Sequence, residues 1–177
     1  IADCLDAIEE EYGVTVLYAC ESGSRAWGFP SSDSDYDVRF IYLHPRDWYL
    51  SIDLERRDDT IDPPVRGEID VHGWDLRKAL GLFRSANPTL LDWLQSPIVY
   101  REDAAVMARW RELVPDYYTP RTAGHAYRGM AQSVAAQNLA EEPIPHKAYL
   151  YVLRALLAVR WTKQRSEPVP VEFDRHV

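Results

Sequence analysis

Strand-like runs occur only in the first half of this chain, and that restriction constrains its fold more than any other feature. Residues 14–20, 36–43 and 67–74 are rich in β-forming side chains. After residue 75 the apolar residues recur at helical spacing instead. The sequence therefore predicts an α+β fold, in which helices pack on a small mixed β-sheet and a helical C-terminal region follows.

Capping residues mark where two of the expected helices begin. Asp75 is a suitable N-cap for a helix that continues through Phe83, and Asn87-Pro88 restarts the chain into a helix over 89–95. Residues 53–66 are charged, contain two prolines and are expected to form a connection. The other expected helices cover residues 1–12, 102–113, 122–140 and 146–163, and residues 21–35 are expected to form a turn, a short helix and a loop.

Composition places the chain among globular proteins. Its 177 residues are 46% apolar and 27% charged, which is enough to bury a sizeable core and argues against wholesale disorder. No segment approaches the ~18–20 uncharged apolar residues of a membrane span. The two cysteines, Cys4 and Cys20, form neither a disulfide framework nor a metal-type spacing. We therefore expect a cytoplasmic protein with reduced thiols and no membrane association.

Charge is divided unevenly along the chain. The net charge of −8 does not suggest a general nucleic-acid coat, but residues 1–75 carry a net −12 and residues 121–165 a net +5. An acidic half that faces a basic half could join metal ions to phosphates. Solvated faces of ordinary helices and loops would give the same distribution, so charge alone leaves both interpretations open.

Two carboxylates at the start of the second strand-like run are the first sign of chemistry. Asp35 and Asp37 lie two residues apart, so both side chains point to one face of a strand. Neighbouring carboxylates repel unless a cation lies between them, and Mg²⁺ binds through one or two carboxylates together with substrate phosphates. On the third run, Glu68 and Asp70 also share one face. Either can complete a three-carboxylate cluster able to hold two metal ions ~3.5–4 Å apart.

A turn of small residues follows the first strand-like run. Gly23 lets a phosphate approach the backbone, Ser24 supplies a hydroxyl donor and Arg25 adds a cation. The turn would aim backbone N–H groups at an anion. Close by, Trp27 and Phe29 can either stack on a base or pack in the core. The turn thus offers hydrogen-bond donors for a phosphate, and the following strand offers metal ligands.

Other loop and nucleophile motifs do not fit this stretch. An EF-hand loop that opened two residues before Asp35 would need glycine and glutamate where Val38 and His44 stand. The Gly-Lys-Ser/Thr of a Walker loop is absent, and neither Ser22 nor Ser24 lies in a Gly-x-Ser-x-Gly elbow. The pattern therefore favours metal-assisted phosphoryl chemistry over calcium binding or serine hydrolysis.

These residues resemble the signature of nucleotidyltransferases of the DNA polymerase β superfamily. In that signature, Gly-Ser after a strand is followed by Asp-x-Asp and by a third acid on a later strand; Gly23-Ser24, Asp35-Tyr36-Asp37 and Ile69-Asp70-Val71 match it. The resemblance is closest to the predicted nucleotidyltransferases associated with RNA-repair ligases and extends to about Trp161. The further matching stretches are Glu21 to Tyr42, Gly73 to Lys78, Asn87-Pro88, Leu91-x-Trp93-Leu94 and Ser96 to Tyr100.

The resemblance implies a nucleotidyltransferase fold and a metal-dependent enzyme that uses a nucleoside triphosphate and Mg²⁺ or Mn²⁺. Such an enzyme transfers a nucleoside monophosphate to a hydroxyl acceptor, for example an RNA end, and releases pyrophosphate. The resemblance implies that Asp35, Asp37 and Asp70 are the catalytic residues and metal ligands, with Glu68 as the rival third ligand. RNA and an RNA-repair ligase are the partners that it suggests. The alternative is a nucleotide-binding regulatory or antitoxin-like module without turnover.

The same resemblance assigns residues to the nucleotide. Gly23, Ser24 and Arg25 are expected at its phosphates. Lys147 and Arg154, seven apart on one face of an expected helix, are expected to reach the triphosphate, unless they are simply solvated. We expect residues 1–100 to form the nucleotidyltransferase catalytic domain, residues 101–165 a helical C-terminal region and residues 166–177 a linker or frayed tail.

Overall fold

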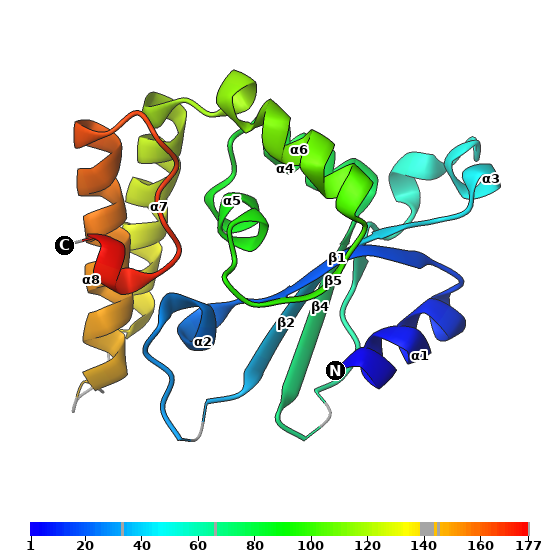
Figure 1. Ribbon diagram of the computed structural model, residues 1–177, viewed down its shortest axis with the longest axis horizontal. Helices are drawn as coiled ribbons and strands as arrows, with labels where there is room; N and C mark the ends of the chain where they lie inside the picture. The colour runs from blue at the N-terminus through cyan, green and yellow to red at the C-terminus, as the bar shows by residue number, and fades with distance from the viewer. Residues whose placement is uncertain (33, 66, 139–143, 145, 177) are drawn as a thin grey trace.

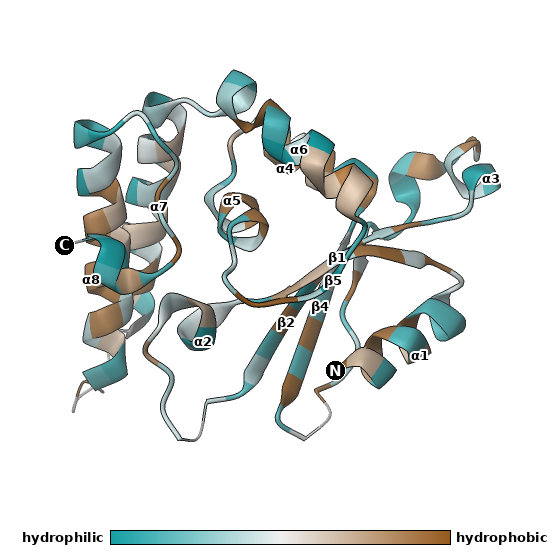
Figure 2. Ribbon diagram, viewed as in Figure 1, coloured by the Kyte–Doolittle hydropathy of each residue, from teal (hydrophilic) through white to brown (hydrophobic). Residues whose placement is uncertain are grey.

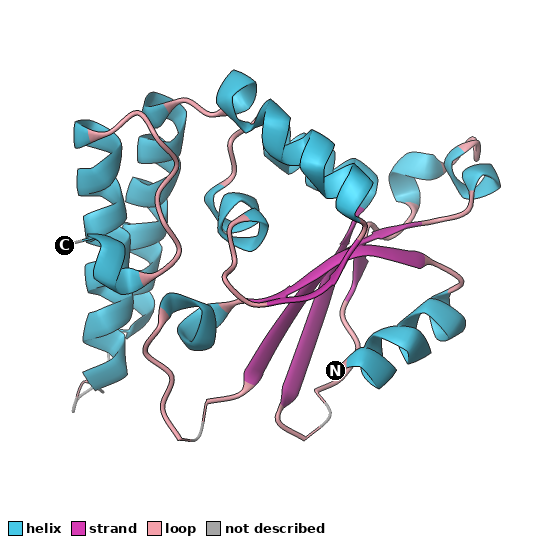
Figure 3. Ribbon diagram, viewed as in Figure 1, coloured by secondary structure: helices cyan, strands magenta, loops and turns pink. Residues whose placement is uncertain are grey.

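A computed structural model of the chain describes residues 1–32, 34–65, 67–138, 144 and 146–176. Its centre is a mixed, five-stranded sheet with the strand order β3-β4-β2-β1-β5 (Figures 1 and 3). The β2 and β4 strands run parallel, and every other neighbouring pair is antiparallel. The strands are β1 (Thr15–Glu21), β2 (Tyr36–Leu43), β3 (Thr60–Ile61), β4 (Ile69–Asp75) and β5 (Val99–Glu102). The predicted α+β class with a small mixed sheet is confirmed.

A single long helix, α1 (Ala2–Tyr12), covers one face of the sheet (Figure 1). Its Leu5 and Ile8 are buried against apolar residues that point down from β1, β2 and β4. Figure 2 shows the alternation of apolar and polar residues along β4 that lets one side of a strand enter this core. Gly13 ends α1 in the left-handed conformation, with φ 62°, as expected for a glycine just after a helix.

Three helices pack on the opposite face of the sheet: α4 (Leu76–Arg84), α5 (Pro88–Leu94) and α6 (Ala104–Tyr117). The indole rings of Trp74 and Trp93 stack there with their centroids 3.8 Å apart. Both predicted N-caps are confirmed: the carboxylate of Asp75 accepts a hydrogen bond from the backbone of Arg77 at 2.8 Å, and the side chain of Asn87 accepts one from Leu90 at 3.1 Å.

Two longer helices, α7 (Pro120–Asn138) and α8 (His146–Gln164), form a hairpin beside the sheet (Figure 1). Short helices complete the structure: α2 (Gly23–Trp27), α3 (Arg46–Tyr49), η1 (Leu54–Arg56) and η2 (Phe173–His176). Among the helices that the structure describes, none has the length and apolar character needed to cross a bilayer.

The end of the chain is packed, so the prediction of a linker or frayed tail for residues 166–177 is wrong for its described part. Val169 and Val171 are each only 1% exposed, and the segment continues into η2. The side-chain amide of Gln95 donates to the carbonyl of Val169 at 3.3 Å, and His176 contacts the carbonyl of Pro170 at 2.6 Å. The prolines suggested a linker, but the valines next to them supply apolar surface that is buried in the fold.

Two short strands were missed by the sequence analysis. β3 lies within residues 53–66, which were expected to form only a connection, and β5 precedes a helix that was expected from residue 102 and begins at Ala104. β5 pairs antiparallel with the free edge of β1. Strands of two and four residues are too short for an alternating pattern to show in a sequence.

Candidate active site

The two strands that carry the predicted acids are neighbours in the sheet. β2 and β4 run parallel in a register that places Asp37 directly opposite Asp70. Because side chains alternate along both strands, the two carboxylates lie on the same face. The sequence analysis required the third strand to lie beside the second, and the pairing confirms this arrangement.

A guanidinium group joins these two carboxylates. Nη2 of Arg39 lies 2.8 Å from Oδ1 of Asp37 and 2.7 Å from Oδ2 of Asp70. Nη1 of the same side chain donates to the carbonyls of Val38 and Asp70, each at 3.3 Å. A cation between neighbouring carboxylates was expected, but Arg39 was not predicted to supply it, although its position two residues after Asp37 puts it on the same strand face.

The carboxylate of Asp37 has competing neighbours. Burial raises its pKa, and the nearby charges of Asp70 and Asp35 act in the same direction. The charges of Arg39 and of Lys147 lower it. The net effect is a raised pKa even with Arg39 beside the group, so this carboxyl group binds a proton more readily than an ordinary aspartate.

Glu21, at the end of β1, is a buried acid that sequence reasoning missed. Its carboxylate accepts a hydrogen bond from the backbone N–H of Asp37 at 2.9 Å and another from the hydroxyl of Tyr100. Burial raises the pKa of Glu21. Through these contacts Glu21 joins the ends of β1 and β5 to the start of β2 and thereby fixes the backbone that carries Asp37.

The remaining two acids are placed differently. Asp35 is exposed just before β2, and its backbone carbonyl accepts a hydrogen bond from Nε of Arg25 at 3.1 Å. Glu68 is exposed before β4, where its carbonyl accepts the N–H of Tyr36 at 2.7 Å. The register therefore brings Asp70, and not Glu68, opposite Asp37. In the described part of the chain, no three acid, histidine or cysteine side chains are gathered closely enough to bind a metal ion.

Gly23 lies against the carboxylate of Asp37. It adopts φ +59°, and a Cβ atom built on it would overlap Oδ2 of Asp37. The neighbouring residue, Ser22, donates its N–H to the carbonyl of Asp37 at 2.8 Å. Only glycine fits this position, because any side chain would meet both an unfavourable backbone conformation and the acid.

Ser24 and Arg25 are engaged with the loop that leads into β2. The buried hydroxyl of Ser24 donates to Oγ of Ser34 at 3.2 Å. Arg25 donates from Nη2 to the carbonyl of Ser34 at 2.7 Å, and its guanidinium lies 4.0 Å from the ring centroid of Tyr36. In the structure, both side chains hold this loop against α2.

Lys147 and Arg154 lie on α8 but differ in their surroundings. Arg154 is 3% exposed, donates to Oδ2 of Asp92 at 2.7 Å and lies over the ring of Trp27 at 4.4 Å. Lys147 is exposed, and its charge lowers the pKa of Asp37. The two residues therefore do not present a common charged surface: Lys147 is exposed, with Nζ 5.9 Å from the ring centroid of Tyr151, whereas Arg154 forms a buried ion pair.

The aromatic residues that follow the Gly-Ser turn pack against one another. Trp27 makes an edge-on contact with Tyr151 of α8, with centroids 5.3 Å apart. Phe29 makes a similar contact with Phe173 of η2 at 5.5 Å. Of the two interpretations left open by the sequence, the structure shows the packing one, and this cluster attaches α2 to the helical hairpin.

Comparison with known proteins places the chain in a family. Residues 1–177 match the sequence profile of the RNA repair pathway DNA polymerase beta family. The chain belongs to this family. The match spans the whole chain, so it covers the strands that carry the acids, the Gly-Ser turn and the helical hairpin.

Two individual proteins extend the family comparison. The chain is 45% identical over 173 residues to the uncharacterized protein YcgL of Bacillus subtilis (strain 168), with 98% of this chain and 66% of YcgL covered. It thus spans just under two thirds of the length of that relative. It is also similar to the crystal structure of a nucleotidyltransferase-like protein from Exiguobacterium sibiricum 255-15, at 12% identity over 98% of this chain and 61% of that chain, with a TM-score of 0.42.

Membership of this family implies a divalent metal, and the donors at Asp37 and Asp70 suit one. Each acid turns one oxygen towards the same cation, the guanidinium of Arg39. Their side chains are 31% and 34% exposed, so a hydrated ion from solvent can reach them. Carboxylate oxygens are the ligands that Mg²⁺ prefers. The third acid of the predicted set, Asp35, is exposed just before β2.

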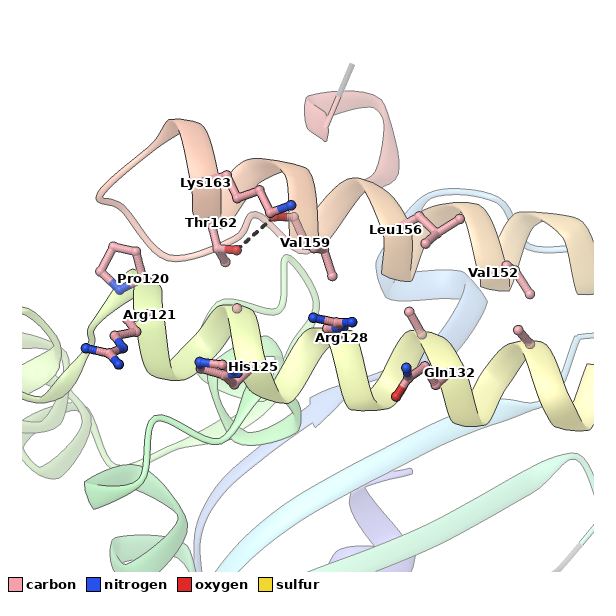
Figure 4. Close-up of a pocket in the computed structure, with 13 residues that line it drawn as sticks. Pro120, Arg121, His125, Arg128, Gln132, Val152, Leu156, Val159, Thr162 and Lys163 are labelled. Atoms are coloured by element: carbon pink, nitrogen blue, oxygen red, sulfur yellow. Dashed lines mark hydrogen bonds between the residues drawn. The ribbon is translucent and has the colours of Figure 1, made fainter.

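A groove of about 860 Å³ lies elsewhere, between α7 and α8 (Figure 4). Apolar side chains such as Val152 and Leu156 line it, with Arg121, Arg128 and Lys163 nearby. None of the candidate site residues lines this groove. The groove and the acids of β2 and β4 are therefore separate features of the structure.

Proposed function

We propose that this chain is the catalytic unit of a metal-dependent nucleotidyltransferase. It would transfer a nucleoside monophosphate from a nucleoside triphosphate to a hydroxyl acceptor, such as an RNA end, and release pyrophosphate. The observation that carries this proposal is the position of Asp37, which lies opposite Asp70 and against Gly23 of the Gly-Ser turn. Family membership supports the reaction class. The acceptor is a separate part of the proposal, since related folds serve many substrates.

Asp35, Asp37 and Asp70 are the proposed ligands for Mg²⁺ or Mn²⁺. When bound, the metal would neutralise the charge that develops on the phosphate oxygens. Asp70 is the proposed acceptor of the proton from the attacking hydroxyl. The hydroxyl oxygen then forms a bond to the α-phosphorus while the bond from that phosphorus to the pyrophosphate oxygen breaks. Glu21 keeps Asp37 in position through the backbone hydrogen bond described above.

The phosphates of the nucleotide would lie along the turn that begins α2. We assign Gly23 and Ser24 to the leaving pyrophosphate, because the glycine allows close approach and the serine carries a hydroxyl. Lys147 is the proposed cation for the triphosphate, since its charge already acts on Asp37. Arg25 would support this site by holding the loop at Ser34, and Arg154 by fixing α8, because both guanidinium groups are paired within the chain.

The experiment is label transfer from each α-labelled nucleoside triphosphate, with Mg²⁺ or Mn²⁺, to RNA, protein and small-molecule acceptors. The wild-type chain should transfer label, and a variant carrying Asp35→Asn and Asp37→Asn should not, with unchanged far-ultraviolet circular dichroism. Asp6→Asn is the matched control, because Asp6 pairs with Arg101 on the α1 side of the sheet. Undiminished transfer by the double variant would overturn the proposal.

The position of Arg39 favours one alternative. A guanidinium that neutralises Asp37 and Asp70 would let the fold persist without metal, as a nucleotide-binding regulatory or antitoxin-like module without turnover would require. Calorimetry distinguishes the two functions. Binding of a triphosphate with no release of pyrophosphate, whichever acceptor is supplied, would favour the binding module.

A further inference from the structure

We propose that Arg39 competes with the divalent metal for Asp37 and Asp70, so that a metal that binds both acids displaces its guanidinium. This inference rests on the proposed function, because it takes these two carboxylates to be metal ligands. It makes Arg39 a positioning residue that sets how tightly the site binds metal.

The contact distances lead to this competition. One nitrogen, Nη2, lies between an oxygen of Asp37 and an oxygen of Asp70, at 2.8 and 2.7 Å. Oxygen ligands approach Mg²⁺ to ~2.0–2.1 Å, so two oxygens that share one ion lie at most ~4.2 Å apart. A metal bound to these two oxygens would lie only a few ångströms from Nη2 and would draw on the same oxygen lone pairs, and two cations at such a separation repel each other. The metal and the guanidinium therefore compete for this pair of oxygens.

The strand register explains why Asp37 and Asp70 need a cation beside them even when no metal is bound. Asp37 and Asp70 are direct partners across the parallel pair, and like charges that face each other across strands are destabilising. Arg39 follows Asp37 on the same strand face and has only 16% of its side chain exposed. Its Nη1 is also held by two backbone carbonyls. The arginine thus keeps the two carboxylates together until a metal replaces it.

Two other charged groups act on this pair from neighbouring elements. Asp35, before β2, adds negative charge near Asp37, and Lys147 of α8 adds positive charge. Both charges remain when Arg39 is replaced. The substitution therefore removes one positive charge and leaves the other charges around the two acids unchanged. Arg39→Met keeps most of the side-chain volume, which makes it the sharpest variant for this test.

The experiment measures Mn²⁺ binding by calorimetry and by the electron paramagnetic resonance signal of free Mn²⁺. Arg39→Met should bind Mn²⁺ about tenfold more tightly than the wild type, the size expected when a competing charge-assisted contact is lost. Arg111→Met is the control, since Arg111 pairs with Glu102 on the surface, and its Mn²⁺ affinity should equal that of the wild type. A variant with both Asp37→Asn and Asp70→Asn should lose this binding.

Thermal unfolding supplies a second readout. Without metal, Arg39→Met should unfold at a lower temperature than the wild type, because the repulsion between the two acids is no longer offset. Adding Mn²⁺ should raise its Tm by more than it raises that of the wild type, since a ligand that binds only the native state stabilises it more the more tightly it binds. If Arg39→Met does not fold, Arg39→Lys is measured instead and should bind Mn²⁺ more tightly than the wild type, because ammonium lacks the fork that contacts the backbone carbonyls.

Equal or weaker Mn²⁺ affinity in the Arg39 variant overturns the inference. This outcome is separable from failure of the proposed function. If the wild type transfers no nucleotide but Arg39→Met binds Mn²⁺ more tightly, the competition holds and the reaction is wrong. If the wild type transfers nucleotide and Mn²⁺ affinity does not change, the reaction holds and the competition is wrong.

Discussion

At the scale of single residues, Gly23 is the position with the least freedom. Replacing it with alanine places a Cβ against Oδ2 of Asp37 in a backbone conformation, φ +59°, that alanine disfavours. We expect Gly23→Ala to lower the free energy of unfolding by ~1–3 kcal/mol and to reduce label transfer at least about tenfold, because Asp37 must move. Urea unfolding and α-label transfer measure the two effects.

Gly13→Ala separates the two causes. Gly13 has nearly the same φ, +62°, but nothing lies within 4 Å of a Cβ built there. Its variant should lose stability to a similar backbone strain and keep full transfer per folded molecule. Equal losses of transfer in both variants would show that the contact with Asp37 has no role in the reaction.

Single residues also show which parts of this site could be predicted from the sequence. Alternation along two strands was enough to predict that Asp37 and Asp70 share a face, since the period of a strand is fixed. It could not predict that Arg39 binds both acids, because a charged residue on a strand face has many potential partners. Glu21 was missed because an acid at the end of an apolar strand gives no sign that a distant tyrosine, Tyr100, will pair with it.

At the scale of elements, helices and strands long enough to show several repeats of their apolar pattern were predicted well, whereas the short strands were not. The second strand was predicted with its observed bounds, and the caps at Asp75 and Asn87 mark real helix starts. β5 is only four residues long and exists because the edge of β1 is available to it. The packed tail likewise depends on tertiary contacts of Val169 and Val171, which no local pattern records.

The packed tail makes stability depend on pH through His176. Burial lowers the pKa of His176 below its ordinary value of 6.5, and Nδ1 of its ring has no hydrogen-bond partner among the described residues. The folded state therefore resists protonation, so stability that is complete above pH 6.5 is lost as the pH falls through this value. We expect the Tm of the wild type to fall between pH 7 and pH 5 by more than that of His176→Gln. Parallel pH profiles for the two proteins would contradict this.

At the scale of the whole molecule, the sheet and the α7–α8 hairpin meet around buried charges. Asp92 of α5 receives Arg154 of α8 at 2.7 Å and the hydroxyl of Tyr127 of α7 at 3.3 Å. Trp27 of α2 covers the same arginine. These contacts join the part of the chain that carries the acids to the part that carries Lys147. The α7–α8 hairpin is thus fixed to the body of the sheet by a buried ion pair and an aromatic contact.

The two members of this ion pair should not be equivalent when removed. Asp92→Asn leaves the guanidinium of Arg154 buried without its counter-charge, which should cost ~3–5 kcal/mol in the free energy of unfolding. Arg154→Met should cost less, ~1–3 kcal/mol, because burial raises the pKa of Asp92 and lets the carboxyl group take up a proton while Tyr127 still donates to it. Urea unfolding at pH 7 measures both, with Glu102→Gln as a surface control that should cost less than ~1 kcal/mol.

The same variant tests whether Arg154 contacts the nucleotide. Because Arg154 is paired with Asp92 inside the protein, Arg154→Met should leave the KM for the nucleoside triphosphate unchanged after correction for the folded fraction. A raised KM would instead place Arg154 at the nucleotide site.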